Sequence, residues 1–290
     1  MNERIPIVLK ADGDCAYAEA LAAHLKTTLL HTTPDAPVWL SVDAAGLSLT
    51  DGDQAMRGDF TKLQKRLQYH NLTHELLVKA TKVKGRERLR VIDATAGMGE
   101  DSLLLAAAGC EVTLFEQDPV IAALLQDTMR RALEEATLHE IVMRMQLVEG
   151  DSIDHLRRIG EAGTGSEAPE DDAGHACSTL TASAATGNDA ATATSGSDTA
   201  LKRPDVIYLD PMFPERQKSG LVKKKFQLIH YLEAPAENEE ALMQAAIDAR
   251  PFKIVVKRPA KGPYLAGLKP SYSLDGKAIR YDCYVFPENV

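Results

Sequence analysis

From Leu89 onward, short apolar runs of strand type alternate with amphipathic runs of helix type. Most of these apolar runs are nearly continuous, as in strands whose sheet is covered on both faces, and the intervening helices favour parallel pairing. The last run, SYSLDGKAIRYDCYVF, instead contains two strands joined at Asp275-Gly276. The sequence therefore predicts an α/β fold, with a five-stranded parallel sheet extended by a C-terminal antiparallel hairpin.

This plan is typical of Rossmann-like class I methyltransferases and unusual for dehydrogenases. We expect the domain to occupy residues 61–290. Residues 1–60 hold one strand-like run, an Ala-rich helical stretch and two alternating runs around Ala45-Gly46. They predict a small N-terminal α/β unit with a hairpin. Apolar residues recur at helical spacing from Phe60 to Val83, which predicts a helix there.

Residues 160–202 form an insertion between a predicted helix and a predicted strand. Gly, Ala, Ser and Thr dominate this segment, so we expect it to be disordered. From Gly160 to Ala200 it holds seven acids and no Lys or Arg, in a chain whose net charge is −9. The remaining chain is thus close to neutral and has basic clusters, with six cations between Lys79 and Arg90. The acidic total does not exclude a nucleic-acid partner.

The composition also bears on compartment and metal content. The first residues show no charged and apolar leader, and no apolar run approaches the about 18 residues of a membrane span. The cysteines are scattered and form no CxxC pair, which favours reduced thiols over zinc or redox sites. We therefore expect a cytoplasmic protein with no metal ion and no membrane partner.

The stretch VIDATAGMGEDSLLLA indicates a strand, a glycine turn and a helix start. Gly97 and Gly99 allow close backbone approach to a ligand, but Ser102 stands where a dinucleotide-binding pattern has its third glycine. Glu100 and Asp101 would repel a phosphate and suit the cationic amino group of S-adenosylmethionine. Asp101 has a second interpretation, because it could simply cap the helix.

Two further strand ends carry acids. Glu116 ends the next strand, nineteen residues after Gly97, where a carboxylate can hold a ribose diol; the alternative is a solvated turn residue. Asp151-Ser152 ends the third strand, near the expected adenine ring. Asp151 could accept the adenine amino hydrogen or cap the following helix, and the sequence does not decide between them.

The fourth strand ends in DPMF, which resembles the [DNS]-P-P-[YFW] motif of methyltransferases that modify exocyclic amino groups of bases. Such an amine is a poor nucleophile. Asp210 can orient it and stabilise its developing charge, Pro211 stiffens the turn, and Phe213 can stack on an extruded base. Lys223, Lys224 and Lys225 follow, either as phosphate contacts or as a solvated helix face.

Six segments from Leu72 to Phe286 resemble the ribosomal RNA small subunit methyltransferase J family: LLVKA, DATAGMGED, GCEV, YLDPMFPERQKSGLVKKK, VVKRP and LAGLKPSYSLDGKAIRYDCY. The resemblance implies transfer of a methyl group from S-adenosylmethionine to N2 of guanine 1516 in 16S ribosomal RNA. The implied partner is that RNA or the small ribosomal subunit. Implied cofactor contacts are Glu100, Asp101, Glu116, Gln117, Asp151, Ser152 and Asp210. Lys257 and Arg258 of VVKRP join the three lysines as predicted RNA contacts.

Two other functions compete with this hypothesis. A nucleotide-dependent oxidoreductase would share the glycine turn, but the acids in that turn, Ser102 and the terminal hairpin argue against it. A non-catalytic RNA-binding or ribosome-assembly protein would share the whole fold. The Asp210–Phe213 corner and Glu116 favour the enzyme over this alternative.

Overall fold

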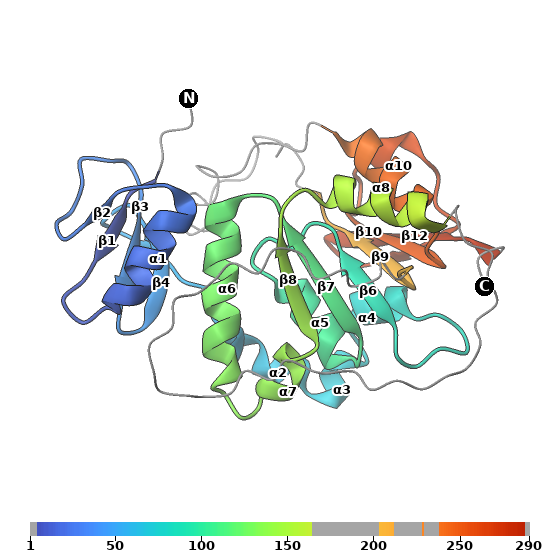
Figure 1. Ribbon diagram of the computed structural model, residues 1–290. Helices are drawn as coiled ribbons and strands as arrows, with labels where there is room; N and C mark the ends of the chain where they lie inside the picture. The colour runs from blue at the N-terminus through green and yellow to red at the C-terminus, as the bar shows by residue number, and fades with distance from the viewer. Residues whose placement is uncertain (1–4, 164–202, 212–227, 229–237, 288–290) are drawn as a thin grey trace, which may run out of the picture.

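The computed structural model describes residues 5–163, 203–211, 228 and 238–287, which form two sheets (Figure 1). The larger sheet has seven strands in the order β11-β12-β10-β9-β6-β7-β8. Its strands are β6 (Arg90–Asp93), β7 (Glu111–Glu116), β8 (Met145–Glu149), β9 (Val206–Leu209), β10 (Lys253–Pro259), β11 (Tyr272–Asp275) and β12 (Ile279–Val285).

Five neighbouring strands, from β8 to β10, are parallel, and β12 runs antiparallel to both β10 and β11. The turn of this terminal hairpin closes where the Gly276 amide donates to the Ile279 carbonyl at 2.8 Å. The predicted fold class is therefore confirmed, including the hairpin at Asp275-Gly276. In this topology β6 and β9 lie at the point where the strand order reverses, which is where open α/β sheets bind ligands.

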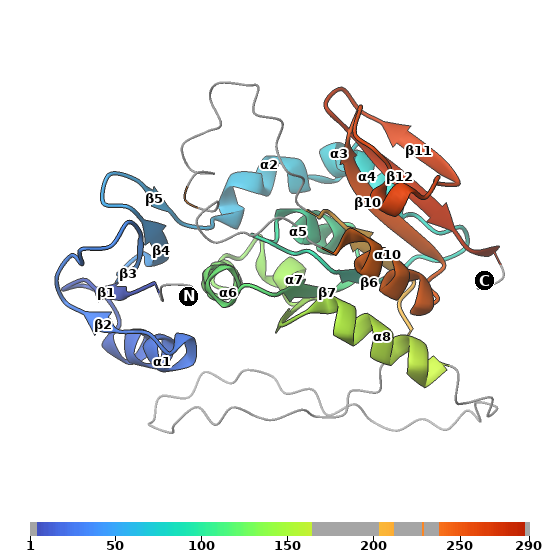
Figure 2. The same cartoon turned by 90° about the horizontal axis from the view of Figure 1, so that it is seen from above.

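Helices cover both faces of the larger sheet, as Figure 2 shows. One face packs mainly against α4 (Leu76–Thr81), α5 (Glu100–Ala107) and α7 (His139–Val142), whose buried leucines and valines join one core. The other face packs against α8 (Ser152–Gly163), α10 (Glu239–Asp248) and the short η2 (Leu265–Gly267) in a second core. Coverage on both sides explains the nearly continuous apolar strands.

A smaller sheet has the order β2-β1-β3-β4-β5. Its strands are β1 (Ile7–Leu9), β2 (Leu29–Leu30), β3 (Trp39–Asp43), β4 (Gly46–Thr50) and β5 (Ala55–Met56), with α1 (Cys15–Leu25) beside them. The β3–β4 hairpin forms around Ala45-Gly46 as expected, because the Asp43 carboxylate accepts the Ala45 amide at 2.8 Å and Gly46 has φ of 106°.

The smaller sheet packs against α6 (Pro119–Leu133) of the larger unit (Figure 1). Ala123 and Leu124 of α6 belong to the same apolar core as the strands β1, β3 and β4. The buried Asp127 carboxylate of α6 also accepts the Leu47 amide of β4 at 3.0 Å. One helix therefore serves both sheets.

The segment predicted as helical, Phe60 to Val83, is helical in four short pieces and not in one continuous helix. They are η1 (Phe60–Leu63), α2 (Gln64–Leu67), α3 (Tyr69–Leu72) and α4. The backbone is extended at Gln68, with ψ of 135°, and at Glu75, with ψ of 127°. Each piece still turns its leucines toward the core, so apolar packing rather than helix continuity accounts for the periodicity.

No helix in the part of the chain that the structure describes is long and apolar enough to cross a membrane. The greater part of the predicted insertion, residues 164–202, lies outside the described residues.

Candidate active site

The carboxyl ends of neighbouring strands bring the predicted acids to one edge of the larger sheet. Asp93 ends β6 and Glu116 ends β7, while Asp210 directly follows β9. β10 contributes Lys257 to the same edge, one residue beyond the registered pair Val256 and Leu209. Parallel strands share this edge, so their terminal side chains converge even though they are far apart in sequence.

The glycine turn between β6 and α5 takes left-handed backbone angles, with φ of 52° at Gly97 and 73° at Gly99. A Cβ atom on Gly97 would meet nothing within 4 Å, whereas one on Gly99 would lie 2.6 Å from the Leu125 side chain. Gly99 thus permits tight packing on α6, and Gly97 leaves open space over the turn. No side chain caps the start of α5.

Ser102, at the position of the third glycine of the dinucleotide-binding pattern, forms a hydrogen bond with a buried carboxylate. Its hydroxyl donates to the Asp93 carboxylate at 2.6 Å, and the Thr95 amide donates to the other oxygen at 3.1 Å. Asp93 is 1% exposed, and this burial raises its pKa to about 7 against the two hydrogen bonds that lower it. The sequence analysis assigned no role to Asp93 or Thr95.

Glu116 is buried rather than solvated, so the turn-residue alternative is wrong. One carboxylate oxygen accepts the Gly97 amide at 2.9 Å and the other accepts the Asp118 amide at 2.8 Å. Burial raises the pKa of Glu116, and these backbone hydrogen bonds oppose that rise. Asp118 caps α6 itself. Gln117, predicted as a neighbouring contact, is exposed.

Asp101 does not cap its own helix. Its carboxylate accepts the Tyr208 hydroxyl at 2.6 Å and the Lys257 ammonium at 2.7 Å. The same ammonium donates to the Asp210 carboxylate at 2.8 Å. Lys257 therefore bridges the two acids that were predicted to lie near the methionine end of the cofactor. Glu100, the other acid of the turn, is exposed.

Opposing charges and burial set the electrostatics of this bridge. Burial raises the pKa of Asp210, while the Lys257 charge and hydrogen bond lower it. The two carboxylates raise the pKa of Lys257 despite its burial, so the ammonium stays charged. The Asp210 amide also donates to the Thr95 hydroxyl at 2.7 Å, which ties β9 to the glycine turn.

Lys257 and Arg258 were predicted as RNA contacts, and the structure gives both a different environment. Lys257 is held in the bridge between Asp101 and Asp210. Arg258 is 1% exposed, pairs with Glu239 at 3.2 Å and donates to the Pro263 carbonyl at 2.9 Å. Such burial is at odds with direct contact between the Arg258 side chain and RNA.

The remaining predicted residues are only partly described. Asp151 accepts the Ile153 amide at 2.8 Å and so caps the start of α8, one of its two predicted roles, while Ser152 is buried. Pro211 is buried directly after Asp210. Phe213 and the run from Lys223 to Lys225 lie outside the described residues.

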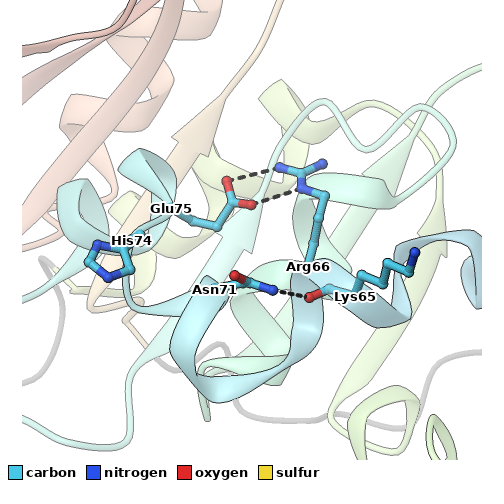
Figure 3. A pocket seen from close by; sticks show the side chains of 5 residues that line it. All are labelled: Lys65, Arg66, Asn71, His74 and Glu75. Carbon is cyan, nitrogen blue, oxygen red and sulfur yellow. Dashed lines mark hydrogen bonds and ion pairs between the residues drawn. The ribbon is translucent and has the colours of Figure 1, made fainter.

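A polar pocket of about 380 Å³ lies beside this edge, lined by Lys65, Arg66, Asn71, His74 and Glu75 (Figure 3). Both Glu75 oxygens accept from the Arg66 guanidinium, at 2.8 and 3.0 Å. The carboxylates of Asp101 and Glu100 are near enough to contribute to the raised pKa of Arg66, after that of Glu75.

Fold and site together define a class of protein. The chain matches the family described as "Putative SAM-dependent methyltransferase" over residues 23–164 and 179–286, and it belongs to that family. A solved S-adenosylmethionine-dependent methyltransferase from Neisseria gonorrhoeae superposes with a TM-score of 0.68 at 26% identity, covering 97% of this chain and 95% of that one. The predicted cofactor is thereby confirmed as S-adenosylmethionine.

The family can be stated more narrowly. Ribosomal RNA small subunit methyltransferase J of Thioalkalivibrio sulfidiphilus is 38% identical over 98% of each chain. Its counterpart in Pseudomonas fluorescens is 36% identical, covering 97% of this chain and 94% of the relative. The chain belongs to the ribosomal RNA small subunit methyltransferase J family, as predicted, and the resemblance extends beyond residues 72–286 to nearly its whole length.

The described side chains fit the cofactor of this class. The open space above Gly97 admits a ligand against the backbone. The Glu116 carboxylate beside it is already oriented by two amides. Asp101 and Asp210 share the single charge of Lys257, so this part of the edge keeps a net negative charge. Glu116 can accept hydrogen bonds from the ribose diol of S-adenosylmethionine, and Asp101 and Asp210 suit its cationic methionine end.

Proposed function

We propose that this enzyme methylates the exocyclic N2 of a guanine in 16S ribosomal RNA, at position 1516 by family resemblance. The relatives named above are small-subunit ribosomal RNA methyltransferases, and this name supports the substrate class. The single observation that carries the chemistry is the bridge Asp101–Lys257–Asp210 at the sheet edge. Free 16S ribosomal RNA or the small ribosomal subunit is the partner in this proposal, in the cytoplasm.

In the proposed binding mode, Glu116 holds the ribose diol of the cofactor, and Asp101 lies toward its methionine end. Gly97 and Gly99 allow the backbone to approach, with Glu100 and Gln117 at the exposed rim. Ser152 and the second oxygen of Asp151 lie toward the adenine. S-adenosylmethionine supplies the methyl group that is transferred, from its sulfonium sulfur.

Asp210 acts on the acceptor in this proposal. Its carboxylate accepts an N–H of the guanine amino group, which orients the nitrogen lone pair and stabilises the positive charge that develops on it. Lys257 is a positioning residue, because it hydrogen-bonds to the Asp210 carboxylate and its charge opposes the effect of burial on the pKa of Asp210. Pro211 fixes its own φ and restricts the backbone of Asp210, which precedes it, and Phe213 provides the ring for base stacking.

The test is single-turnover methylation of 16S ribosomal RNA with tritiated cofactor, comparing the parent with Asp210→Ala at saturating RNA. Removing a group that stabilises developing charge costs about 10²–10³ in rate in comparable sites, so we expect the variant to bind S-adenosylhomocysteine yet transfer methyl groups that much more slowly. Mass-spectrometric mapping of the RNA identifies the product. Transfer at the parental rate by folded Asp210→Ala would refute the assigned role.

A further inference from the structure

A basic surface lies at the amino ends of the parallel strands of the larger sheet, whereas Asp210 lies at their carboxyl ends. Asp205 precedes β9 and Asp210 follows it, so the two edges are separated by the length of the strand, about 15 Å. Around Asp205 the chain brings together residues 82–90, 203–205 and 248–253. These segments contain eight cations and three acids, in a chain whose overall charge is −9. The local charge is thus opposite to that of the whole molecule.

The arginines of this surface are arranged around two buried groups. Asp205, 3% exposed, pairs with Arg86 at 3.0 Å and with Arg90 at 3.7 Å. The guanidinium carbons of Arg86 and Arg203 lie over the Phe252 ring, at 4.0 and 4.8 Å from its centroid. Arg86 also donates to Asp205, and Arg203 donates to the Arg250 carbonyl. Stacking fixes the plane of a guanidinium, and its five N–H donors let it contact a phosphate in addition to an acceptor within the protein.

Like charges crowd one another here, since Arg250, Arg86 and Arg90 are near enough to lower the pKa of Arg203, after burial itself. The buried Asp205 carboxylate pairs with Arg86 and Arg90. Its single negative charge does not balance the positive charges of the arginines around it. Such an excess of one sign disfavours the compact state and raises the local concentration of anions.

Arg250 has a backbone conformation that is uncommon for a residue with a side chain. It follows α10 with φ of 52°, the left-handed conformation that favours glycine. The side chain is nevertheless exposed, so it contributes little packing to offset the cost of that conformation.

We propose that this surface, comprising Lys82, Lys84, Arg86, Arg88, Arg90, Arg203 and Arg250, is a second RNA-binding site. It would hold phosphates of a ribosomal RNA segment distant from the guanine at Asp210. The inference rests on the proposed function for the identity of the RNA. A folded RNA fits better than a protein partner, because planar, stacked guanidinium groups with few acids nearby match a row of phosphates.

The test compares two doubly substituted variants with the same loss of charge. Arg88→Gln/Arg250→Gly removes two exposed cations of the surface, and Arg250→Gly also relieves the left-handed backbone. The control, Lys10→Gln/Lys26→Gly, removes two cations of the N-terminal unit, where Lys26 has the same φ of 52°. Neither variant touches the side chains of the candidate active site, so S-adenosylhomocysteine affinity reports correct folding in both.

Binding to transcribed 16S ribosomal RNA is measured across a salt series. We expect the surface variant to bind about tenfold more weakly at low salt and its log–log salt slope to be shallower by about 1.4, for two phosphate contacts. The control should match the parent. At saturating RNA the methylation rate of the surface variant should equal the parental rate, with a higher KM for RNA.

A parental affinity and salt slope in the surface variant would overturn the inference. So would parental binding to free RNA combined with weakened binding to assembled small subunits, because that result assigns the surface to a ribosomal protein. The methyl-transfer activity of the parent protein is measured in a separate assay. If the parent binds RNA through this surface but does not methylate it, the proposed function fails and the RNA-binding site stands.

Discussion

Asp93 is a carboxyl group buried among neutral donors. Ser102 and Thr95 supply its hydrogen bonds, while the Asp101 and Asp210 carboxylates nearby add repulsion to the effect of burial. Its pKa of about 7 in the folded protein is far above the ordinary value of 3.8. The folded state therefore binds a proton that the unfolded state releases between these two pH values.

This difference predicts how stability depends on pH. The contribution of neutral Asp93 is present below pH 4 and is lost as pH rises through about 7, at a cost of up to about 4 kcal/mol. Asn at this position keeps acceptor and donor groups without ionising. Asp93→Asn should therefore gain stability relative to the parent between pH 5 and pH 8, as measured by urea unfolding at both values. Equal pH dependence in the two proteins would show that Asp93 stays ionised.

Some of these side chains were predictable and others were not. Glu116, Asp101 and Asp210 follow apolar strands or the glycine turn, so local sequence places them at the carboxyl edge of a parallel sheet. Lys257 was assigned to RNA because the strand neighbour of Asp210 depends on sheet order and register, which sequence spacing does not encode. Ser102 was seen only as a missing glycine, because its partner Asp93 had no recognised role. The surroundings of Phe213 and the three lysines remain predictions.

At the level of elements, α6 is where the two sheets meet. Asp127 is 1% exposed and accepts from the Leu47 amide of β4, from Arg130 and from Arg131. Arg131 in turn donates to the Gly58 carbonyl at 2.7 Å. A single carboxylate thus joins the helix to a strand of the smaller sheet.

Asp127→Ala should destabilise the protein by about 1.5–3 kcal/mol, because it leaves the buried Leu47 amide without its charged acceptor. Glu134→Ala is the matched control. Glu134 is an exposed partner of Arg130 at 4.0 Å, and such surface pairs contribute at most about 1 kcal/mol. Urea unfolding with an unchanged slope measures both. If the two variants lose the same stability, the Asp127 contact does not hold the sheets together.

At the level of the whole molecule, charge is distributed unevenly. The described residues stop at Gly163, at the end of α8, and resume at Arg203, three residues before β9 begins at Val206. Both points lie at the edge of the basic surface, opposite the candidate active site. The sequence between them carries acids and no Lys or Arg until Lys202.

Replacing residues 164–199 with a short Gly-Ser linker should leave folding and S-adenosylhomocysteine binding unchanged, because loop length costs little free energy. It should strengthen RNA binding at low salt, since the deletion removes six acids and no Lys or Arg from a chain whose partner is an anion. The matched variant keeps the segment and converts those acids to amides. Filter binding should give both the same gain. If RNA affinity rises only in the deletion variant, the size of the segment and not its charge opposes RNA binding. If the deletion variant is insoluble, the segment is required for folding.

The helix α6 also connects the glycine turn of the candidate active site with the smaller sheet, two regions that are far apart in the sequence. It starts at Pro119, three residues after Glu116, whose carboxylate accepts the Gly97 amide of the glycine turn. Residues on one side of α6 belong to the core of the smaller sheet. Met98 of that same turn packs against this core as well. Because the glycine turn and the smaller sheet share this core, we expect cofactor binding at Glu116 to increase the amide protection of β3 and β4. Hydrogen exchange with and without S-adenosylhomocysteine measures this effect.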